Sequence, residues 1–101
     1  MGTVPAGHLM LYMVIERTPK ESVAAVGERF RLKGRMLPDA VRYQASWLND
    51  DGSVCYQLME SETRERLDLW ISCWSDLVTF EVTPVVTSAD FWAAREANSA
   101  G

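Results

Sequence analysis

The residues that could hold a ligand in this chain are aromatic side chains with a few amides and hydroxyls among them. Trp70 and Trp74 are four residues apart, so they share one face of a helix, and Gln57 lies among apolar residues of an extended segment. Flat rings with a few fixed polar groups are typical of pockets for small apolar molecules. We therefore expect a ligand pocket between sheet and helices, drawn from seven residues: Tyr12, Tyr43, Trp47, Tyr56, Gln57, Trp70 and Trp74.

The same aromatic side chains also fit a solid hydrophobic core. In that interpretation, backbone groups satisfy the polar atoms of the tyrosine and tryptophan rings, and no cavity is left. Truncation separates the two interpretations, because Trp74→Ala would abolish ligand binding in one case and only destabilise the core in the other. The sequence alone leaves both open.

The sequence lacks the residues that metal binding and histidine-assisted catalysis require. The only histidine, His8, lies in a short lead-in, so we expect no metal, no cofactor and no histidine-assisted nucleophile. Glu16 and Glu60 end two strands that we expect to run antiparallel, which places them at opposite ends of the sheet. We predict that they are rim residues or partners of Arg17 and Arg42, and that any proton transfer falls to a tyrosine or a glutamate.

Composition limits the kinds of partner that we expect the protein to bind and the cellular compartment in which we expect it to work. A net charge of −4 over 101 residues argues against nucleic-acid binding, which depends on a basic surface. The apolar stretch at residues 9–15 is too short to span a membrane, and no secretion signal precedes it. Cys55 and Cys73 are widely spaced, so we expect two free thiols in a reducing cytoplasm, with an exported protein carrying one disulfide as the alternative.

Residues 41–60 have the pattern of a β-hairpin around which the other elements are arranged. Asp51-Gly52 predicts a type I′ turn that pairs Leu48 with Cys55, Trp47 with Tyr56 and Ser46 with Gln57. Alternation then gives two faces, and the sequence does not decide which meets the helices. One face carries Tyr43, Ala45, Trp47, Tyr56 and Leu58, and the other carries Gln44, Ser46, Cys55, Gln57 and Met59.

Strands are also expected at residues 9–17 and 79–86, with helices after the first and third strands. Thr18 should cap the first helix with Pro19 and Glu21, and the helix should end near Gly34. Its buried stripe contains Val23, Val26 and Phe30, with Gly27 allowing close approach to the sheet. Ser61 or Thr63 should cap the second helix, and Ser88 with Asp90 a short third one. The second stripe contains Leu67, Trp70, Ile71, Trp74 and Leu77.

This βαββαβ order predicts an α+β, ferredoxin-like domain over residues 9–97, with a flexible lead-in at 1–8 and a disordered tail at 98–101. The strands at 9–17 and 54–60 are apolar on both faces and should be central, whereas Pro84 places the last strand at an edge. Two helices cover only one face of such a sheet. The open face would expose apolar side chains, so we expect a homodimer that covers it.

Several segments resemble a small bacterial family described only as a domain of unknown function. They are LYMVIER, GERFRLKGRMLP, SWLNDDGSVCYQLME and FEVTPVVTSADFW, and the resemblance covers roughly residues 9–94. The family is similar to the dimeric α/β barrel group, in which two sheets pack face to face. That group includes cofactor-free monooxygenases, polyketide cyclases, lactone isomerases and haem-binding proteins, and its pockets commonly lie between sheet and helices. The resemblance identifies no catalytic residue.

Two other classes share this element order. RNA-recognition modules need a basic and aromatic motif on the third strand, where this chain has Asp51-Gly52-Ser53-Val54. Amino-acid-sensing regulatory domains have a ligand loop that nothing here resembles. We therefore expect a protein that binds a small flat apolar molecule, either without chemistry or as a cofactor-free monooxygenase-like or cyclase-like enzyme. The alternative is a non-catalytic dimeric interaction or regulatory module.

Overall fold

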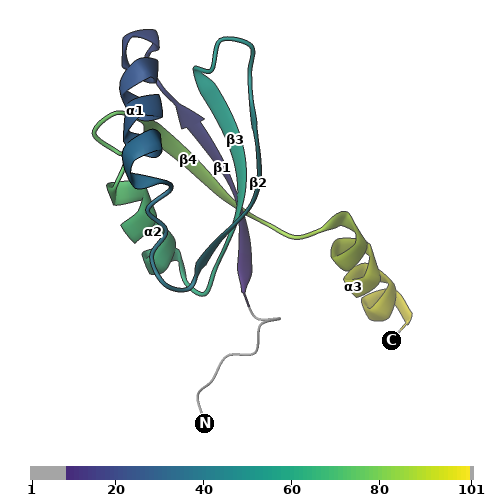
Figure 1. The fold of residues 1–101 in the computed structure, drawn as a ribbon. Helices are drawn as coiled ribbons and strands as arrows, with labels where there is room; N and C mark the ends of the chain where they lie inside the picture. The colour runs from purple at the N-terminus through teal and green to yellow at the C-terminus, as the bar shows by residue number, and fades with distance from the viewer. Residues whose placement is uncertain (1–8, 101) are drawn as a thin grey trace.

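The computed structural model describes residues 9–100, with side chains up to residue 97, so the lead-in at 1–8 lies outside the described residues (Figure 1). The predicted α+β, ferredoxin-like order is confirmed. Its elements are β1 (Met10–Arg17), a 3-10 helix η2 (Lys20–Ser22), α1 (Val23–Lys33), β2 (Val41–Leu48), β3 (Val54–Ser61), α2 (Arg64–Ser72), β4 (Thr79–Val85) and α3 (Ser88–Ala100).

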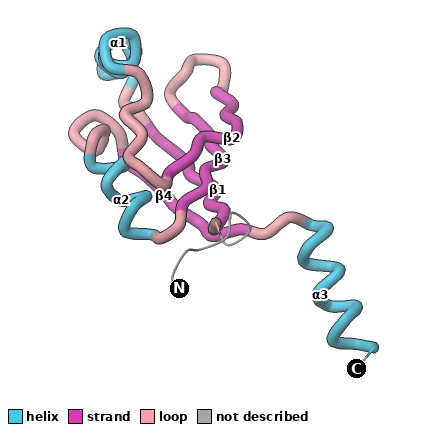
Figure 2. The backbone as a smooth tube through the Cα atoms, turned by 60° about the horizontal axis from the view of Figure 1, so that its bottom comes forward, coloured by secondary structure: helices cyan, strands magenta, loops and turns pink. Residues whose placement is uncertain are grey.

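The four strands form one antiparallel sheet in the order β2-β3-β1-β4. The two strands predicted to be central are central, and Pro84 lies on the edge strand β4, where a missing N–H is tolerated. Both α1 and α2 lie on one side of the sheet, which we call the helix-facing side (Figures 1 and 2). The other side, the open face, is covered by no helix of residues 9–100 (Figures 1 and 2).

The hairpin has the predicted register, with Ser46 opposite Gln57, Trp47 opposite Tyr56 and Leu48 opposite Cys55. The predicted type I′ turn is wrong. Only Gly52 has a positive φ in the connection, 77°, and its N–H donates to the carbonyl of Asn49 at 3.1 Å. A longer loop therefore joins the strands, with a turn before the glycine instead of two left-handed residues.

A β-bulge corrects the predicted faces of the hairpin. The register shifts between Tyr43 and Ala45, which places Tyr43 opposite Met59 on the helix-facing side. Gln44 moves to the open face, where its amide donates to Glu60 at 2.6 Å. An extra residue reverses the alternation on one side of the bulge, and periodicity alone does not reveal it.

The first helix begins later and packs less closely than predicted. Thr18, Pro19 and Glu21 do not form a capping box: the chain makes the 3-10 turn η2, and α1 starts at Val23 without a side-chain cap. Gly27 is exposed, and a Cβ there would meet nothing within 4 Å, so it does not mediate a close approach to the sheet. No residue of α1 is fully buried.

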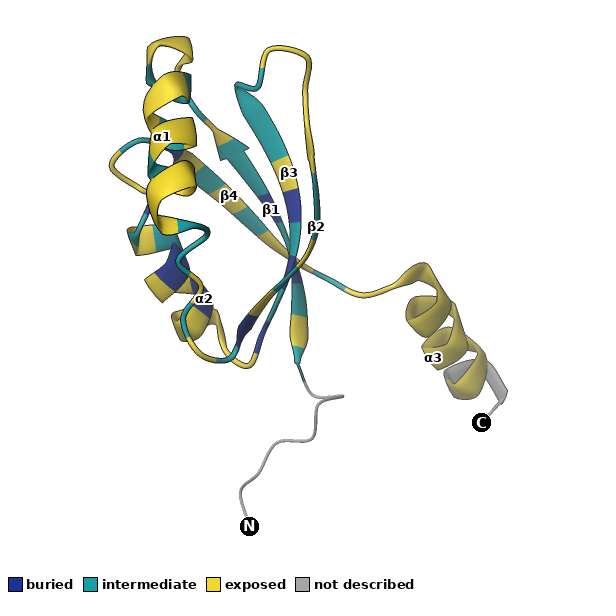
Figure 3. Ribbon diagram, in the orientation of Figure 1, coloured by how far each residue is buried: buried dark blue, intermediate teal, exposed yellow. Residues whose placement is uncertain are grey.

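The second helix supplies Leu67 and Trp70 to the core. Thr63 caps α2 by accepting from the N–H of Arg66 at 3.1 Å, which settles the choice left open with Ser61. The Trp70 ring meets the Phe80 ring edge-on, with centroids 5.7 Å apart. The buried core consists of Tyr12, Val14, Val41, Met59, Leu67, Trp70 and Trp74 (Figure 3).

The third helix stands apart from the sheet in both ribbon and tube views (Figures 1 and 2). Thr87, not Ser88, caps it, because the Thr87 hydroxyl accepts from the N–H of Asp90 at 3.0 Å. The helix runs to Ala100 and has 13 residues, so it is longer than the short helix predicted from the sequence. Phe91 and Trp92 on it are 43% and 60% exposed, so α3 buries neither ring against its own chain.

Candidate functional site

A cavity of about 320 Å³ lies between the helix-facing side of the sheet and α1. This volume is at the lower end of the range, roughly 300–1,000 Å³, that small-molecule sites occupy. Strands β1, β2 and β3 supply one wall, α1 supplies the opposite wall, and the end of α2 closes one side. The lining residues are Glu16, Thr18, Val26, Gly27, Phe30, Arg35, Ser46, Leu48, Gly52, Cys55, Gln57, Trp70 and Trp74.

The cavity exists because α1 stands off the sheet. Arg29 fixes this helix at a distance by pairing with both carboxylate oxygens of Asp76, each at 2.7 Å, and by donating to the carbonyl of Cys73 at 3.0 Å. Its guanidinium also lies 5.6 Å from the centre of the Trp74 ring. These contacts tie α1 to the turn after α2, and the small residue Gly27 leaves the space between helix and sheet unfilled.

Glu16 places a carboxyl group in this cavity. It follows Tyr12 and Val14 on the helix-facing side of β1, where both of those side chains are buried. Burial raises the pKa of Glu16 from 4.5 to about 7, although the positive charge of Arg35 and the hydrogen bond from Gln57 oppose that rise. The carboxyl group can therefore take up or release a proton near neutral pH, as a general acid or base must.

Gln57 connects this carboxyl group to a guanidinium. Its side chain is 5% exposed, and its amide N–H donates to the carboxylate of Glu16. Its amide oxygen accepts from Nε of Arg35 at 3.4 Å. Only this orientation of the amide presents its donor to the carboxylate and its acceptor to the guanidinium. Gln57 therefore fixes the positions of both charged groups.

The backbone at Arg35 is held by two tryptophans. The indole N–H groups of Trp70 and Trp74 both donate to the Arg35 carbonyl, each at 3.1 Å. The flanking residues Gly34 and Met36 have φ values of 67° and 58°. Left-handed backbone at a methionine costs about 1 kcal/mol or more, so the two indoles stabilise a conformation that the loop alone does not favour.

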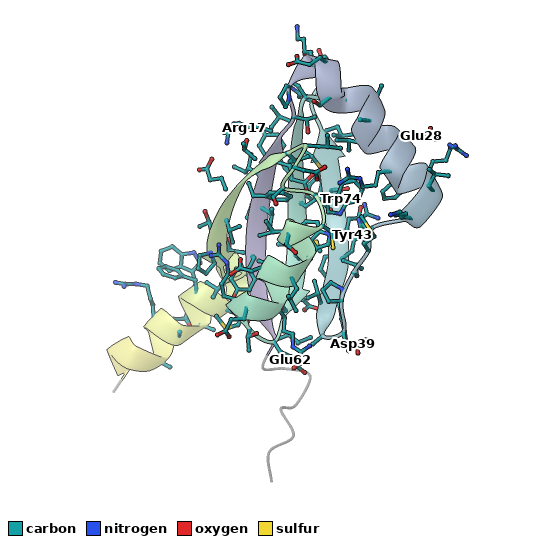
Figure 4. All side chains as sticks on the ribbon, turned by 90° about the vertical axis from the view of Figure 1, so that its left-hand side faces the viewer. Arg17, Glu28, Asp39, Tyr43, Glu62 and Trp74 are labelled. Carbon is teal, nitrogen blue, oxygen red and sulfur yellow. The ribbon has the colours of Figure 1, made fainter. Side chains whose placement is uncertain are left out.

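The Arg35 side chain is held by aromatic rings. Its guanidinium carbon lies 3.4 Å from the centre of the Tyr43 ring and 5.2 Å from the centre of the Phe30 ring. The Tyr43 hydroxyl in turn hydrogen-bonds to Ser46 at 2.7 Å. Figure 4 labels two of the residues that contact Arg35: Tyr43, whose ring supports the guanidinium, and Trp74, whose indole N–H donates to the backbone carbonyl.

The surroundings of Cys55 disfavour the reactive, ionised form of its thiol. It lies opposite Glu16 in the sheet register and lines the cavity. Burial, together with the negative charge of Glu16, raises the pKa of the Cys55 thiol from 9.0 to about 11. A thiol of that pKa is almost entirely protonated at neutral pH, and the thiolate is the reactive form.

The chain matches a protein family whose description names no activity. The family model described as Domain of unknown function (DUF3303) matches residues 10–99. The chain belongs to this family. No curated protein and no solved structure matches the chain. The chemistry of this DUF3303 member therefore has to be inferred from the geometry of its own cavity.

The structure distributes the seven residues proposed from the sequence over both sides of the sheet. Gln57, Trp70 and Trp74 line the cavity. Tyr12 is buried in the core on the same side, and Tyr43 lies behind Arg35. Trp47 and Tyr56 lie on the open face with 58% and 43% of their surface exposed, so they are not part of the cavity.

Sequence reasoning missed two residues of this DUF3303 site. Glu16 is not a rim residue, and it is Glu81 that pairs with Arg17, at 2.7 Å. Its position two residues after Val14, on the buried face of a central strand, was the available signal. Arg35 follows the glycine that ends α1, and only the fold shows that this loop turns back over β2 and β3.

The described residues contain neither a cluster of metal ligands nor a membrane-spanning helix. Within residues 9–100, no group of three His, Cys, Asp or Glu side chains converges as metal ligands. Over the same part of the chain, no helix has the length and apolar character that crossing a membrane requires. Both cysteines, Cys55 and Cys73, are free and partly buried.

Proposed function

We propose that this protein binds a small, flat, mostly apolar molecule in the cavity beneath α1 and that Glu16 transfers a proton to or from it. The observation that carries this proposal is a carboxyl group with a pKa of about 7 inside a cavity walled by Phe30, Trp70 and Trp74. Perturbed carboxyl groups in clefts are enriched at functional sites, because catalysis needs a group that exchanges protons at working pH.

Proton transfer by Glu16 fits the reactions expected from the resemblance to dimeric α/β barrels. Cyclisation and isomerisation move protons between carbon and oxygen, and a cofactor-free oxygenation begins by removing a proton from an electron-rich substrate. Aromatic walls would exclude water and keep the carboxyl group in its poised state. Cys55 has the wrong pKa for a nucleophile, which leaves Glu16 as the titrating group of the cavity.

Native mass spectrometry of freshly purified protein tests this proposal. We expect an additional small-molecule mass on the wild type. Gly27→Leu is the matched variant, because position 27 lines the cavity and a Cβ there meets nothing within 4 Å. Leucine would fill the cavity while favouring the helix by roughly 1 kcal/mol. This variant should fold, be at least as stable, and carry no ligand.

A neutral flat probe completes the test when no ligand survives purification. The chain has four tryptophans, and only Trp70 and Trp74 line the cavity. Added 2-naphthol should shift the indole N–H signals of Trp70 and Trp74 in the wild type and not in Gly27→Leu. Bare protein together with unshifted Trp70 and Trp74 signals would contradict the proposal.

We also propose that the chain is a homodimer through its open face. Four strands of up to eight residues present a planar area of roughly 500 Å², given about 4.8 Å between strands and 3.3 Å per residue. Stable interfaces bury about 800 Å² per partner. The 13 residues of α3 add roughly 200 Å² if the helix packs on the second copy. The sheet and the helix together approach what a dimer needs.

The alternative function, a non-catalytic interaction module, draws on the same surfaces. A helix of 13 residues is only marginally stable without a partner, and α3 exposes Phe91 and Trp92. We assign the second copy as the partner because the open face of the same chain exposes Trp47 and Tyr56 as a complementary apolar surface. A monomer in solution would instead favour a different protein as the partner.

A further inference from the structure

Arg35 has hydrogen-bonding capacity that the described residues do not use. A guanidinium has five N–H donors. Between residues 9 and 97, its only acceptor is the Gln57 amide oxygen, at 3.4 Å, and Arg35 belongs to none of the ion pairs. The side chain is half-buried and lines the cavity. None of its nitrogens is both buried and unpaired, so its remaining N–H groups are open to water and to an acceptor from outside the chain.

The guanidinium is also pre-organised for a planar acceptor. Tyr43 and Phe30 support it with their rings, and two indole N–H groups hold its backbone. A fixed, planar guanidinium forms two parallel N–H···O bonds with a carboxylate, which a lysine in the same place would not do. The protein has therefore already restricted the motion that an arginine normally loses when it binds an anion.

The remaining walls define the rest of the ligand. Val26, Phe30, Trp70 and Trp74 present apolar surface on the sides of the cavity next to Arg35. A cation would be repelled by the guanidinium, and a neutral hydrocarbon would leave its donors unpaired. The charged groups that face this position are Arg35 from the loop after α1 and Glu16 from β1, with Cys55 from β3 as the other titratable group.

We infer that the ligand of this cavity is a carboxylate on a small planar apolar body, oriented by a bidentate contact between its carboxylate and Arg35. This inference rests on the proposed function of the cavity and names its substrate class. Arg35 acts as the binding residue, and Glu16 lies next to the bound acid, bridged to Arg35 by Gln57. When Glu16 is protonated it adds a donor for the anion instead of a second negative charge.

A matched pair of probes tests the inference. 2-Naphthoate and 2-naphthamide have nearly the same shape and differ in charge. We expect naphthoate at pH 6 to bind at least tenfold more tightly, with shifts at the indole N–H signals of Trp70 and Trp74. Arg35→Gln should remove this preference by weakening the binding of naphthoate at least tenfold more than the binding of naphthamide. Arg31→Gln is the matched control, because Arg31 is an exposed arginine of α1 that pairs with Glu28.

Each outcome separates the inference from the proposed function. Equal binding of acid and amide, or an equal loss of both in Arg35→Gln, would overturn the carboxylate assignment while leaving a small-molecule site. Binding of neither probe would overturn both. Arg35→Lys keeps the positive charge but loses the planar pair of N–H donors, so it should retain only part of the preference for naphthoate over naphthamide. Unchanged indole signals of Trp70 and Trp74 in the free variants would show that they fold.

Discussion

Gln57 and Glu16 lie diagonally across strands β3 and β1, and the Gln57 amide donates a hydrogen bond to the Glu16 carboxylate. Because the same amide accepts from Arg35, the state of the carboxyl group and the position of the guanidinium are linked. The hydrogen bond favours the ionised form of Glu16, whereas burial favours the neutral form more strongly. A proton and an anion bound in this cavity should therefore affect each other.

The protein should become less stable as the pH rises and Glu16 ionises. Glu16 has a folded pKa of about 7, above its ordinary 4.5, so the unfolded chain loses this proton first as pH rises. Ionisation of Glu16 therefore lowers the free energy of unfolding progressively between pH 4.5 and 7, by at most about 3 kcal/mol. The decrease is smaller if water reaches the carboxyl group. Glu16→Gln should match the wild type near pH 4 and exceed it at pH 8, as measured by urea unfolding. An equal difference at both pH values would contradict this prediction.

The two indole contacts to the Arg35 carbonyl should be coupled. Trp70→Phe and Trp74→Phe each remove one donor and leave the other in place. Each should cost about 1–2 kcal/mol of unfolding free energy, part of it from lost ring volume. The double variant leaves the carbonyl without a side-chain donor, so its cost should exceed the sum of the single costs. Additive costs in a double-mutant cycle would mean that the shared acceptor has no energetic role.

The Cys55 thiol should react slowly with alkylating reagents, and the negative charge of Glu16 should slow that reaction further. With a pKa of about 11, Cys55 should react with iodoacetamide far more slowly at pH 8 than a free cysteine does. Glu16→Gln removes a neighbouring negative charge and should lower the pKa of Cys55 and raise the rate. A Cys73→Ser background leaves one thiol to follow by mass spectrometry, since the chain has two cysteines. An unchanged rate in Glu16→Gln would show that the two groups do not interact.

The open face should carry the dimer contact. Tyr56→Lys introduces a charge on the central strand β3 of that face and should convert a dimer to a monomer in light scattering after gel filtration. Leu69→Lys is the control, because Leu69 is 53% exposed on α2, away from the open face. Removing α3 should weaken the dimer without abolishing it. Dimers that persist in Tyr56→Lys would place the interface elsewhere.

The sheet could be predicted from the sequence because its signals are local and repeated. Apolar residues on both faces identified the central strands, and Pro84 identified an edge. The bulge at Tyr43 and Ala45 could not be predicted, because one extra residue changes faces without changing composition. Gly27 shows a related difficulty, since a glycine on an apolar stripe fits both close packing and an open space.

The candidate site was predicted only in part, for a physical reason. The sequence indicates Gln57, Trp70 and Trp74 because they are polar or bulky residues at positions expected to be buried. All three line the cavity. Glu16 and Arg35 resemble ordinary surface charges in the sequence. Their importance depends on burial by other elements and on a loop that crosses the sheet, and both follow from tertiary structure alone.

The most direct test of this account is an NMR titration of the Glu16 side-chain carboxyl carbon, assigned by its loss in Glu16→Gln. We predict a titration midpoint near pH 7, moved upward when 2-naphthoate is bound, because an anion next to Glu16 favours its protonated form. A midpoint near 4.5 would mean that water reaches the carboxyl group freely. Glu16 would then not exchange its proton near neutral pH, and the proposed proton transfer would fail.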